Sequence, residues 1–507
     1  SMDSGSLEAG TVGGAIALTS TGGSITALDT LRTDSIFGGA GPIQLNAAGN
    51  ISTRDLLAFT FGDQNGGTIQ ATSGGTFSAI DSLISGGTAG AGRAGDLLIR
   101  ADTVDLTNTI VNTGTRGTGI AGGLTLNSRV TNLRDGTALV AGTVGSGRGG
   151  DIRVVASEQL NLSGVSPSSA AVPTQVVTNT TGLGAAGDIF VDAGRVTMQG
   201  GAIIATTAFG DRTGDGGNII VNAAQVDLVG TSPDGTSPTR MATSSFGTGR
   251  AGDLVVNTQR LSVQNGALLT TAVLGAGPDA GSGGNLIVNA TDSVVVQGFA
   301  NTPQGRVPAA LSSDTFRGSG TAGNLTVNTP RLSVLEGGAV SVSSFGDGQG
   351  GTITVNASDR LLVSGADSSG FRSGLYAQAF DQGSAGNLVV NAGQLEIRDR
   401  GTITVASGSA ATAVVPVSTL ENILGLSLAV GPATGAAGNL LINAGRATLT
   451  DSGQILASTD SGQGGNIAIA LREPLVMRRN SLISATAGTA QAGGDGGNIA
   501  IAAPFLI

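Results

Sequence analysis

Hydrophobic residues recur along this chain in short alternating runs, each of which follows a pair of small residues. The pattern reads small residue, Gly, variable residue, Ile or Leu, variable residue, aliphatic residue, and clear copies occupy 216–221 and 283–288. Alternation with a period of two is typical of a strand with one buried face. The pattern therefore predicts a β-strand directly after each pair of small residues.

This pattern repeats from one end of the chain to the other. Sixteen copies begin at residues 13, 40, 66, 94, 121, 149, 186, 216, 251, 283, 322, 350, 385, 437, 464 and 496. The second position is Gly in every copy, and the fourth is always Ile or Leu. A Gly at a fixed point indicates either a positive φ or a close approach of two backbones.

Two further alternating segments follow each copy, such as 394–398 and 402–405. Three short strands and three turns account for the length of the shortest units. A supersecondary unit of this kind buries its hydrophobic face by stacking on its neighbours. We therefore predict an all-β fold over 1–507, a right-handed parallel β-helix (solenoid) of about sixteen three-stranded coils.

The composition agrees with thin stacked layers and removes much of the usual chemistry. The chain has 86 Gly, 13 Phe, one Tyr and no Trp, whereas large globular cores depend on aromatic residues. It has no Cys, no His and no Lys, which removes the commonest general base, thiol nucleophile and zinc ligands. We expect a protein that is not an enzyme and that has no cofactor and no metal site.

The charge pattern limits the classes of partner that the chain is expected to bind. The net charge is −10 with a pI near 4.5, and the Arg residues form no basic patch. Nucleic acid is therefore not an expected partner. No apolar run is long enough to span a membrane. The first residues have no signal-peptide pattern, and we expect the sequence to be a piece of a longer protein.

Two rows of identical side chains are expected to reinforce the stack. Asn fills the seventh position in seven successive units, where amides in register can form hydrogen bonds along the axis. Phe recurs shortly before the next Gly pair, and we expect these rings to stack inside one corner. The predicted structural ladders are Asn222, Asn257, Asn289, Asn328, Asn356, Asn391 and Asn443, with Phe209, Phe246, Phe316, Phe345 and Phe380, and Phe61 as an earlier copy of the Phe pattern.

Insertions interrupt the repeat at regular intervals. The segments 164–173, 230–240, 298–308 and 365–373 follow a second strand in every other unit and are expected to protrude as loops. The intervening units make the same corner tightly, as at Gly200, Gly266 and Gly337. A longer insertion at 407–436 contains a capping-box pattern at Ser418 and Glu421, which predicts a short helix.

An uncharged row is predicted on the outward face of the first strand. It contains Phe190, Ile220, Val255, Ile287, Thr326, Thr354, Val389 and Leu441, and its apolar members form a candidate contact stripe. A monomer rarely exposes so long a stripe, so we expect a neighbouring rod or the 407–436 insertion to cover it. Because the row carries no charge, it disfavours the active site of a carbohydrate-active β-helix enzyme there.

The repeats resemble those of filamentous-haemagglutinin-like exoproteins, above all the cyanobacterial type. The resemblance covers nearly the whole chain and is carried by segments such as 226–235 and 249–263. It implies two-partner secretion through an outer-membrane transporter, followed by folding into a fibre at the cell surface. The chain departs from the family in lacking an N-terminal secretion module with its Asn-Pro-Asn motifs. The resemblance transfers no catalytic residue.

These observations favour a secreted, cell-surface structural or adhesive exoprotein, a fibre segment for attachment, bundling or aggregation. The alternative is a carbohydrate-active β-helix enzyme of the polysaccharide lyase or hydrolase type. A second alternative, a calcium-binding β-roll, would use third-position residues such as Asp96, Asp188 and Asp253, which we interpret as turn residues. The protruding loops are the expected recognition surface for a cell-surface glycan, unless they are only solvated decoration.

Overall fold

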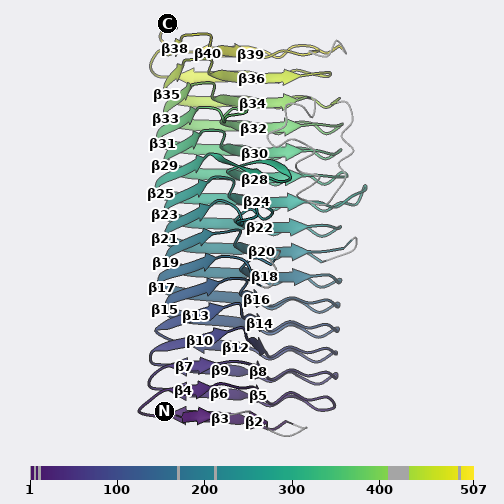
Figure 1. The fold of residues 1–507 in the computed structure, drawn as a ribbon. Helices are drawn as coiled ribbons and strands as arrows, with labels where there is room; N and C mark the ends of the chain where they lie inside the picture. Colours follow the sequence, from purple (N-terminus) through teal and green to yellow (C-terminus); the bar gives the residue numbers. More distant parts are fainter. Residues whose placement is uncertain are drawn as a thin grey trace. The chain divides into compact units, whose positions relative to one another are not determined.

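The computed structural model is all-β. It describes residues 2–4, 7–8, 13–167, 172–210, 214–408, 433–488 and 493–507, and these residues contain strands and turns but no helix. The chain forms two compact units, Ser1–Gln225 and Val226–Ile507. In each unit, consecutive coils stack in parallel (Figure 1). This is the parallel β-helix that the repeats predict. The helix expected within 407–436 falls on residues outside the described ranges.

Unit 1 contributes strands to two parallel sheets. The first contains β1 (Met2–Ser4), β3 (Ile16–Ser20), β4 (Ile25–Ala27), β6 (Ile43–Ala47), β7 (Ile51–Thr53), β9 (Ile69–Ser73), β10 (Thr76–Ile80), β12 (Leu97–Arg100), β13 (Thr103–Thr107), β15 (Leu124–Arg134), β17 (Ile152–Ser163) and β19 (Ile189–Gln199). The second contains β2 (Leu7–Glu8), β5 (Leu31–Arg32), β8 (Leu56–Leu57), β11 (Leu83–Ser85), β14 (Ile110–Asn112), β16 (Ala138–Val140), β18 (Gln175–Thr180) and β20 (Ile203–Ala208). The division between the units falls within β21 (Ile219–Val229).

Unit 2 has the same two-sheet plan. Its first sheet contains β23 (Leu254–Gln264), β25 (Leu286–Gln297), β29 (Leu325–Leu335), β31 (Ile353–Ser364), β33 (Leu388–Arg398), β35 (Leu440–Leu449), β37 (Ile467–Leu471), β38 (Leu475–Met477) and β40 (Ile499–Ala502). Its second contains β22 (Arg240–Ser245), β24 (Leu268–Val273), β28 (Ala310–Thr315), β30 (Ala339–Ser344), β32 (Gly374–Ala379), β34 (Thr402–Ser407), β36 (Gln454–Thr459) and β39 (Leu482–Ser484). An antiparallel hairpin, β26 (Phe299–Thr302) and β27 (Gly305–Pro308), stands apart.

The predicted register is correct in both units. Fourth-position residues pair with one another along the stack, as Ile16 pairs with Ile43 in unit 1 and Leu254 pairs with Leu286 in unit 2. Fourth- and sixth-position side chains such as Leu286 and Val288 are buried inside the coils. Burial of aliphatic side chains, layer upon layer, is the main favourable contribution to the free energy of folding.

The three-strand coil holds only in part. In the first coils of unit 1 the first two strands are separate, but from β15 to β35 they run together as one bent strand. The early bends contain Gly22, Gly49 and Gly75, but Gly alone does not interrupt the strand, because β33 continues through Gly393 and β35 through Gly445. Some long strands also contain a β-bulge, where Ser358 and Asp359 of β31 lie opposite a single residue, Gly393 of β33.

The invariant second-position Gly forms a column of touching backbones. A Cβ at Gly284 would lie 1.8 Å from the carbonyl oxygen of Gly252, and one at Gly351 would lie 1.9 Å from that of Gly323. Neither Gly284 nor Gly351 has a positive φ. Of the two explanations for an invariant Gly, close approach is therefore the correct one at these positions.

The inserted loops lie over the tight corners of the coils before them. A Cβ at Gly266 would come within 2.6 Å of Ala300 Cβ, and one at Gly337 within 2.9 Å of Asp367 Cβ. Both glycines have positive φ, 87° and 84°. An insertion therefore needs a bare corner beneath it, which explains why insertions occur in every other coil.

Candidate functional site

The outward face of the long strands in unit 2 carries two parallel rows of uncharged side chains. One is the fifth-position row, here Val255, Ile287, Thr326, Thr354, Val389 and Leu441, whose apolar members form the predicted stripe, and the other is the Asn row two residues further on. The stripe is half-buried, and Leu441 is 39% exposed. In unit 1, Phe190 and Ile220 are also half-buried. The described residues thus leave the stripe partly open to solvent.

The Asn side chains form a continuous hydrogen-bonded ladder within unit 2. Each amide nitrogen donates to the amide oxygen of the preceding coil, at distances between 2.8 and 3.0 Å. The linked residues are Asn257, Asn289, Asn328, Asn356, Asn391 and Asn443. In unit 1, Asn222 donates instead to Asp192 at 2.8 Å. Side-chain amides in register thus add hydrogen bonds to those of the backbone, as the sequence predicts.

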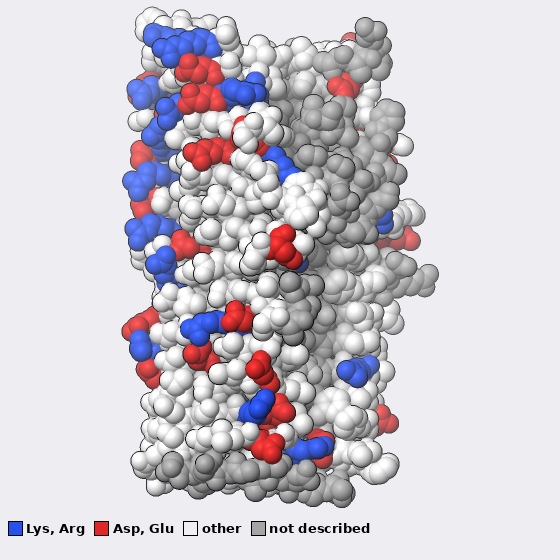
Figure 2. Space-filling view, in the orientation of Figure 1, with Lys and Arg blue, Asp and Glu red and all other residues white. Residues whose placement is uncertain are grey.

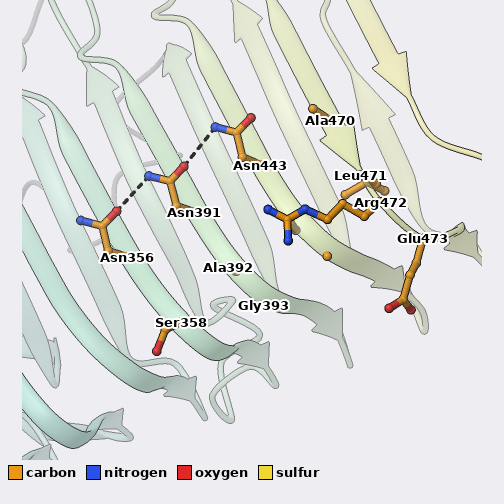
Figure 3. A pocket seen from close by; sticks show the side chains of 12 residues that line it. Asn356, Ser358, Asn391, Ala392, Gly393, Asn443, Ala470, Leu471, Arg472 and Glu473 are labelled. Carbon is orange, nitrogen blue, oxygen red and sulfur yellow. Dashed lines mark hydrogen bonds between the residues drawn. The ribbon is translucent and has the colours of Figure 1, made fainter.

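A groove of about 780 Å³ lies beside the last three amides of this ladder. It follows the bend of the long strands, where the small residues Ala392, Gly393, Ala444 and Gly445 leave space (Figure 3). No larger residue fits at Gly393, because a Cβ there would lie 2.6 Å from Ser358 O. The bulge therefore requires the small side chains that open the groove.

Two charged residues lie at the C-terminal end of the groove. Arg472 and Glu473 follow β37 and are both exposed. The guanidinium of Arg472 extends toward the amide row, whereas the carboxylate of Glu473 projects away from it (Figure 3). Backbone hydrogen bonds from both residues to Gly445 fix this end of the groove. The groove is thus a neutral channel with one cation directed over it.

The third-position Asp and Asn residues form a second ladder that the sequence did not predict. Asp188 Oδ1 accepts the backbone N–H of Asn218 at 2.7 Å, and Asp253 Oδ1 accepts that of Asn285 at 2.8 Å. These turn residues therefore accept backbone hydrogen bonds from the next coil. No group of three or more potential acidic ligands lies together in the described part of the chain.

Only part of the Phe row is buried as expected. It follows a buried row of Ser and Thr that occupies the inner position at this corner, such as Thr60 and Thr315. Phe61 and Phe209 are 57% and 39% exposed, and Phe246 is half-buried. In unit 2, however, Phe345 is only 4% exposed and stacks between Phe316 and Phe380, with ring centroids 5.3 and 4.8 Å away. Alternation along the strand places Phe opposite the buried hydroxyl.

The inserted loops of unit 2 are held in place by a buried cation. Arg306 lies between the rings of Phe299 and Phe371, 5.5 and 4.3 Å from their centroids, and forms an ion pair with Asp367. The side chains of Arg306 and Asp367 are only 9% and 0% exposed. Arg306 and Asp367, which lie in loops expected to form a recognition surface, are thus occupied in joining two of those loops.

The first inserted loop of unit 2, 230–240, is also ordered by its own side chains. Asp234 accepts hydrogen bonds from Ser232 and from the backbone N–H and hydroxyl of Thr236, which lower the pKa of its carboxyl. A side chain at Gly235 would come within 3.0 Å of Pro303 in the hairpin of the next insertion. This loop is therefore a compact turn ordered by its own hydrogen bonds.

Charged side chains gather at the bend of the long strands. Arg129 bonds Asp102 and Glu158 in unit 1, at 3.0 and 2.6 Å, and Arg331 pairs with Asp292 in unit 2. Figure 2 shows blue and red atoms alternating along the margin where Figure 1 draws these strands. The hydrogen bond from Arg129 lowers the pKa of Asp102. These exposed pairs contribute little individually.

A titratable carboxyl lies outside the groove. Burial raises the pKa of Asp314, on β28, to about 7. Hydrogen bonds from Ser341 and from the backbone N–H of Ser343 act in the opposite direction but do not offset the loss of solvent. Burial likewise raises the pKa of Tyr376, whose hydroxyl donates to Arg372 O at 2.5 Å. Among the described residues, the hydrogen bonds to Asp314 come from hydroxyl and backbone N–H groups.

Comparison with known proteins identifies no family for this chain. No protein-family model, curated protein or solved structure matches the chain. Within the described ranges, no helix is long and apolar enough to cross a membrane. The geometry of the coils is therefore the basis for inferring a function.

Proposed function

We propose that the chain is a segment of a secreted structural and adhesive exoprotein of the filamentous-haemagglutinin-like kind. It forms part of a β-helical fibre for attachment, bundling or aggregation at the cell surface. Export proceeds through an outer-membrane transporter in an unfolded state. The absence of Cys suits this route, because no disulfide loop obstructs a threading chain.

The observation that carries the proposal is the repetition of one uncharged outward face. In unit 2 the Asn ladder presents the same amide on successive coils, beside a row of uncharged side chains. A surface of this kind can make many weak contacts of equal geometry, and their combined strength grows by avidity. Attachment and bundling require such repeated contacts.

Secretion and adhesion can be tested together. The natural full-length product is expressed with its candidate transporter, and surface exposure is measured by protease access in intact cells. Beads coated with the purified chain are then tested for attachment to cells and to immobilised glycans. We expect surface exposure and multivalent attachment that weakens when the chain is monomeric. Retention inside the cell, together with beads that attach to nothing, would contradict the proposal.

A further inference from the structure

We propose that the groove beside Asn356, Asn391 and Asn443 binds a neutral, linear polysaccharide whose chain runs along the stack of coils. This inference rests on the adhesive function proposed above and assigns its ligand class and contact site. The wall of the groove is a row of amides, its floor is backbone with small side chains, and Arg472 extends over one end (Figure 3).

The amides retain hydrogen-bonding capacity. Asn391 donates one N–H to Asn356 and accepts one from Asn443, which leaves the second N–H of its amide group for another acceptor. The ladder ends at Asn443, because Ala470 stands opposite it in the next coil. The oxygen of Asn443 therefore receives no amide donor from that coil. Donors and an acceptor thus line one wall.

Sugar hydroxyls suit this wall because each can both donate and accept a hydrogen bond. The amide donors recur at the spacing of parallel strands, about 4.8 Å. An extended β-1,4-linked chain carries hydroxyl groups on every ring along its length. A ligand lying along the stack can therefore bond several coils in succession, whereas one lying across it reaches a single amide.

The charges at the end of the groove favour a neutral chain. Arg472 offers guanidinium N–H donors to hydroxyl or ring oxygens, with no carboxylate bonded to it in the described residues. Glu473 also lines this end of the groove, so the two residues together give it no net charge to attract a polyanion. Because the groove contains no aromatic ring on which a sugar could stack, we expect weak affinity for each site, in the millimolar range.

Matched substitutions separate ligand contact from ladder stability. Asn391→Ala removes an amide inside the groove, whereas Asn328→Ala removes one with the same two ladder bonds outside it. Ser358→Trp fills the groove from the bulge of β31, and Ser157→Trp places the same ring at the equivalent bulge of β17 in unit 1. Both serines are exposed, so neither substitution disturbs the core.

Binding is measured by affinity electrophoresis in native gels that contain hydroxyethyl cellulose, a neutral β-1,4-glucan, or polygalacturonate. We expect retardation by the neutral polymer that persists at high salt, because no ion pair drives it. Asn391→Ala should weaken it roughly 5- to 10-fold, the effect of one lost hydrogen bond, and Ser358→Trp should abolish it. Both control variants should bind like the parent.

Three results would overturn the assignment. In the first, Asn391→Ala and Asn328→Ala weaken binding of the neutral polymer equally. In the second, Ser358→Trp leaves that binding unchanged. In the third, only polygalacturonate retards the chain, and high salt abolishes the retardation. If the Ser358→Trp variant adheres as well as the parent does, the groove is not the binding site, but the proposed adhesive function stands. A parent that binds neither glycans nor cells counts against the adhesive function itself. If Ser358→Trp reduces self-association and not glycan binding, the occupant is a second copy.

Discussion

At the residue scale, each position is selected by the coil beneath it. Gly fills the second position because the carbonyl oxygen of the preceding coil occupies the space of a Cβ. Thr or Ser occurs at the inner end of the third strand, where Thr206 donates to Gly217 O and Thr271 donates to Gly284 O. A buried hydroxyl needs such a partner, and the Gly carbonyls supply it.

Replacing Gly284 with Ala tests the column of touching backbones. The new Cβ would lie 1.8 Å from Gly252 O, so the two coils must separate. We expect destabilisation of about 1–3 kcal/mol or more, seen as a lower midpoint in urea unfolding. Gly22→Ala is the control, since a Cβ there has no neighbour within 4 Å. Equal midpoints for the two variants would contradict the explanation.

Asp314 predicts a pH dependence of stability. Its pKa is raised from 3.8 to about 7 in the folded chain, so the folded state holds a proton that the unfolded chain releases. Stability is therefore highest below the unfolded pKa and decreases as the pH rises toward 7. We expect the urea midpoint to fall between pH 5 and pH 8, and this slope to diminish in Asp314→Asn. An unchanged slope in the variant would show that another group is responsible.

At the element scale, the bent strand creates the surface features. A continuous strand through the bend keeps the Asn row in register, and the bulge and its facing Gly open the groove beside it. The same period of two places the Phe row on the outer side of the buried Ser and Thr row. Strand geometry, more than residue type, therefore decides which groups face solvent.

The Phe row gives a matched test of burial. Phe345 is 4% exposed and stacked on two rings, whereas Phe61 is 57% exposed. Phe345→Ala should cost about 3–5 kcal/mol, as is usual for a buried Phe. Phe61→Ala should cost well under 1 kcal/mol. Thermal melts of the two variants provide the comparison, and equal losses would refute the difference in burial.

At the scale of the whole molecule, the coils repeat while the insertions alternate. The insertions 298–308 and 365–373 each lie over a bare corner of unit 2, and neighbouring insertions contact one another through Arg306, Asp367 and Pro303. The ion pair of Arg306 and Asp367 is buried, so removing one partner alone leaves an uncompensated charge. The insertions therefore behave as a packed set.

Shortening all four insertions to the Gly-containing corners of the other coils tests this arrangement. The variant should fold, because those corners already occur in the chain and both charged partners leave together. We expect a strand-rich circular dichroism spectrum and a cooperative melt. By contrast, Asp367→Ala alone should destabilise by about 3–5 kcal/mol, because Arg306 remains buried. A shortened chain that does not fold, or a single variant that melts like the parent, would contradict this account.

The sequence by itself determined the coils, their register and the Asn ladder. A pattern of period two with a fixed Gly admits one inward set of side chains, and a shift by one residue would expose all of them. Leu286 and Asn289 could therefore be placed on opposite faces from the sequence alone. The candidate groove was not predictable, because its residues come from separate coils and its opening depends on a bulge.

Only the tertiary structure decided which side chains are buried by segments that are distant in sequence. Phe61 and Phe345 occur in the same sequence pattern, yet one is exposed and the other is buried. Arg306 and Asp367, far apart in sequence, form a buried pair because the insertion of one coil lies over the corner of another. Strand periodicity is a local property of the chain, whereas burial depends on which distant segments pack above a residue.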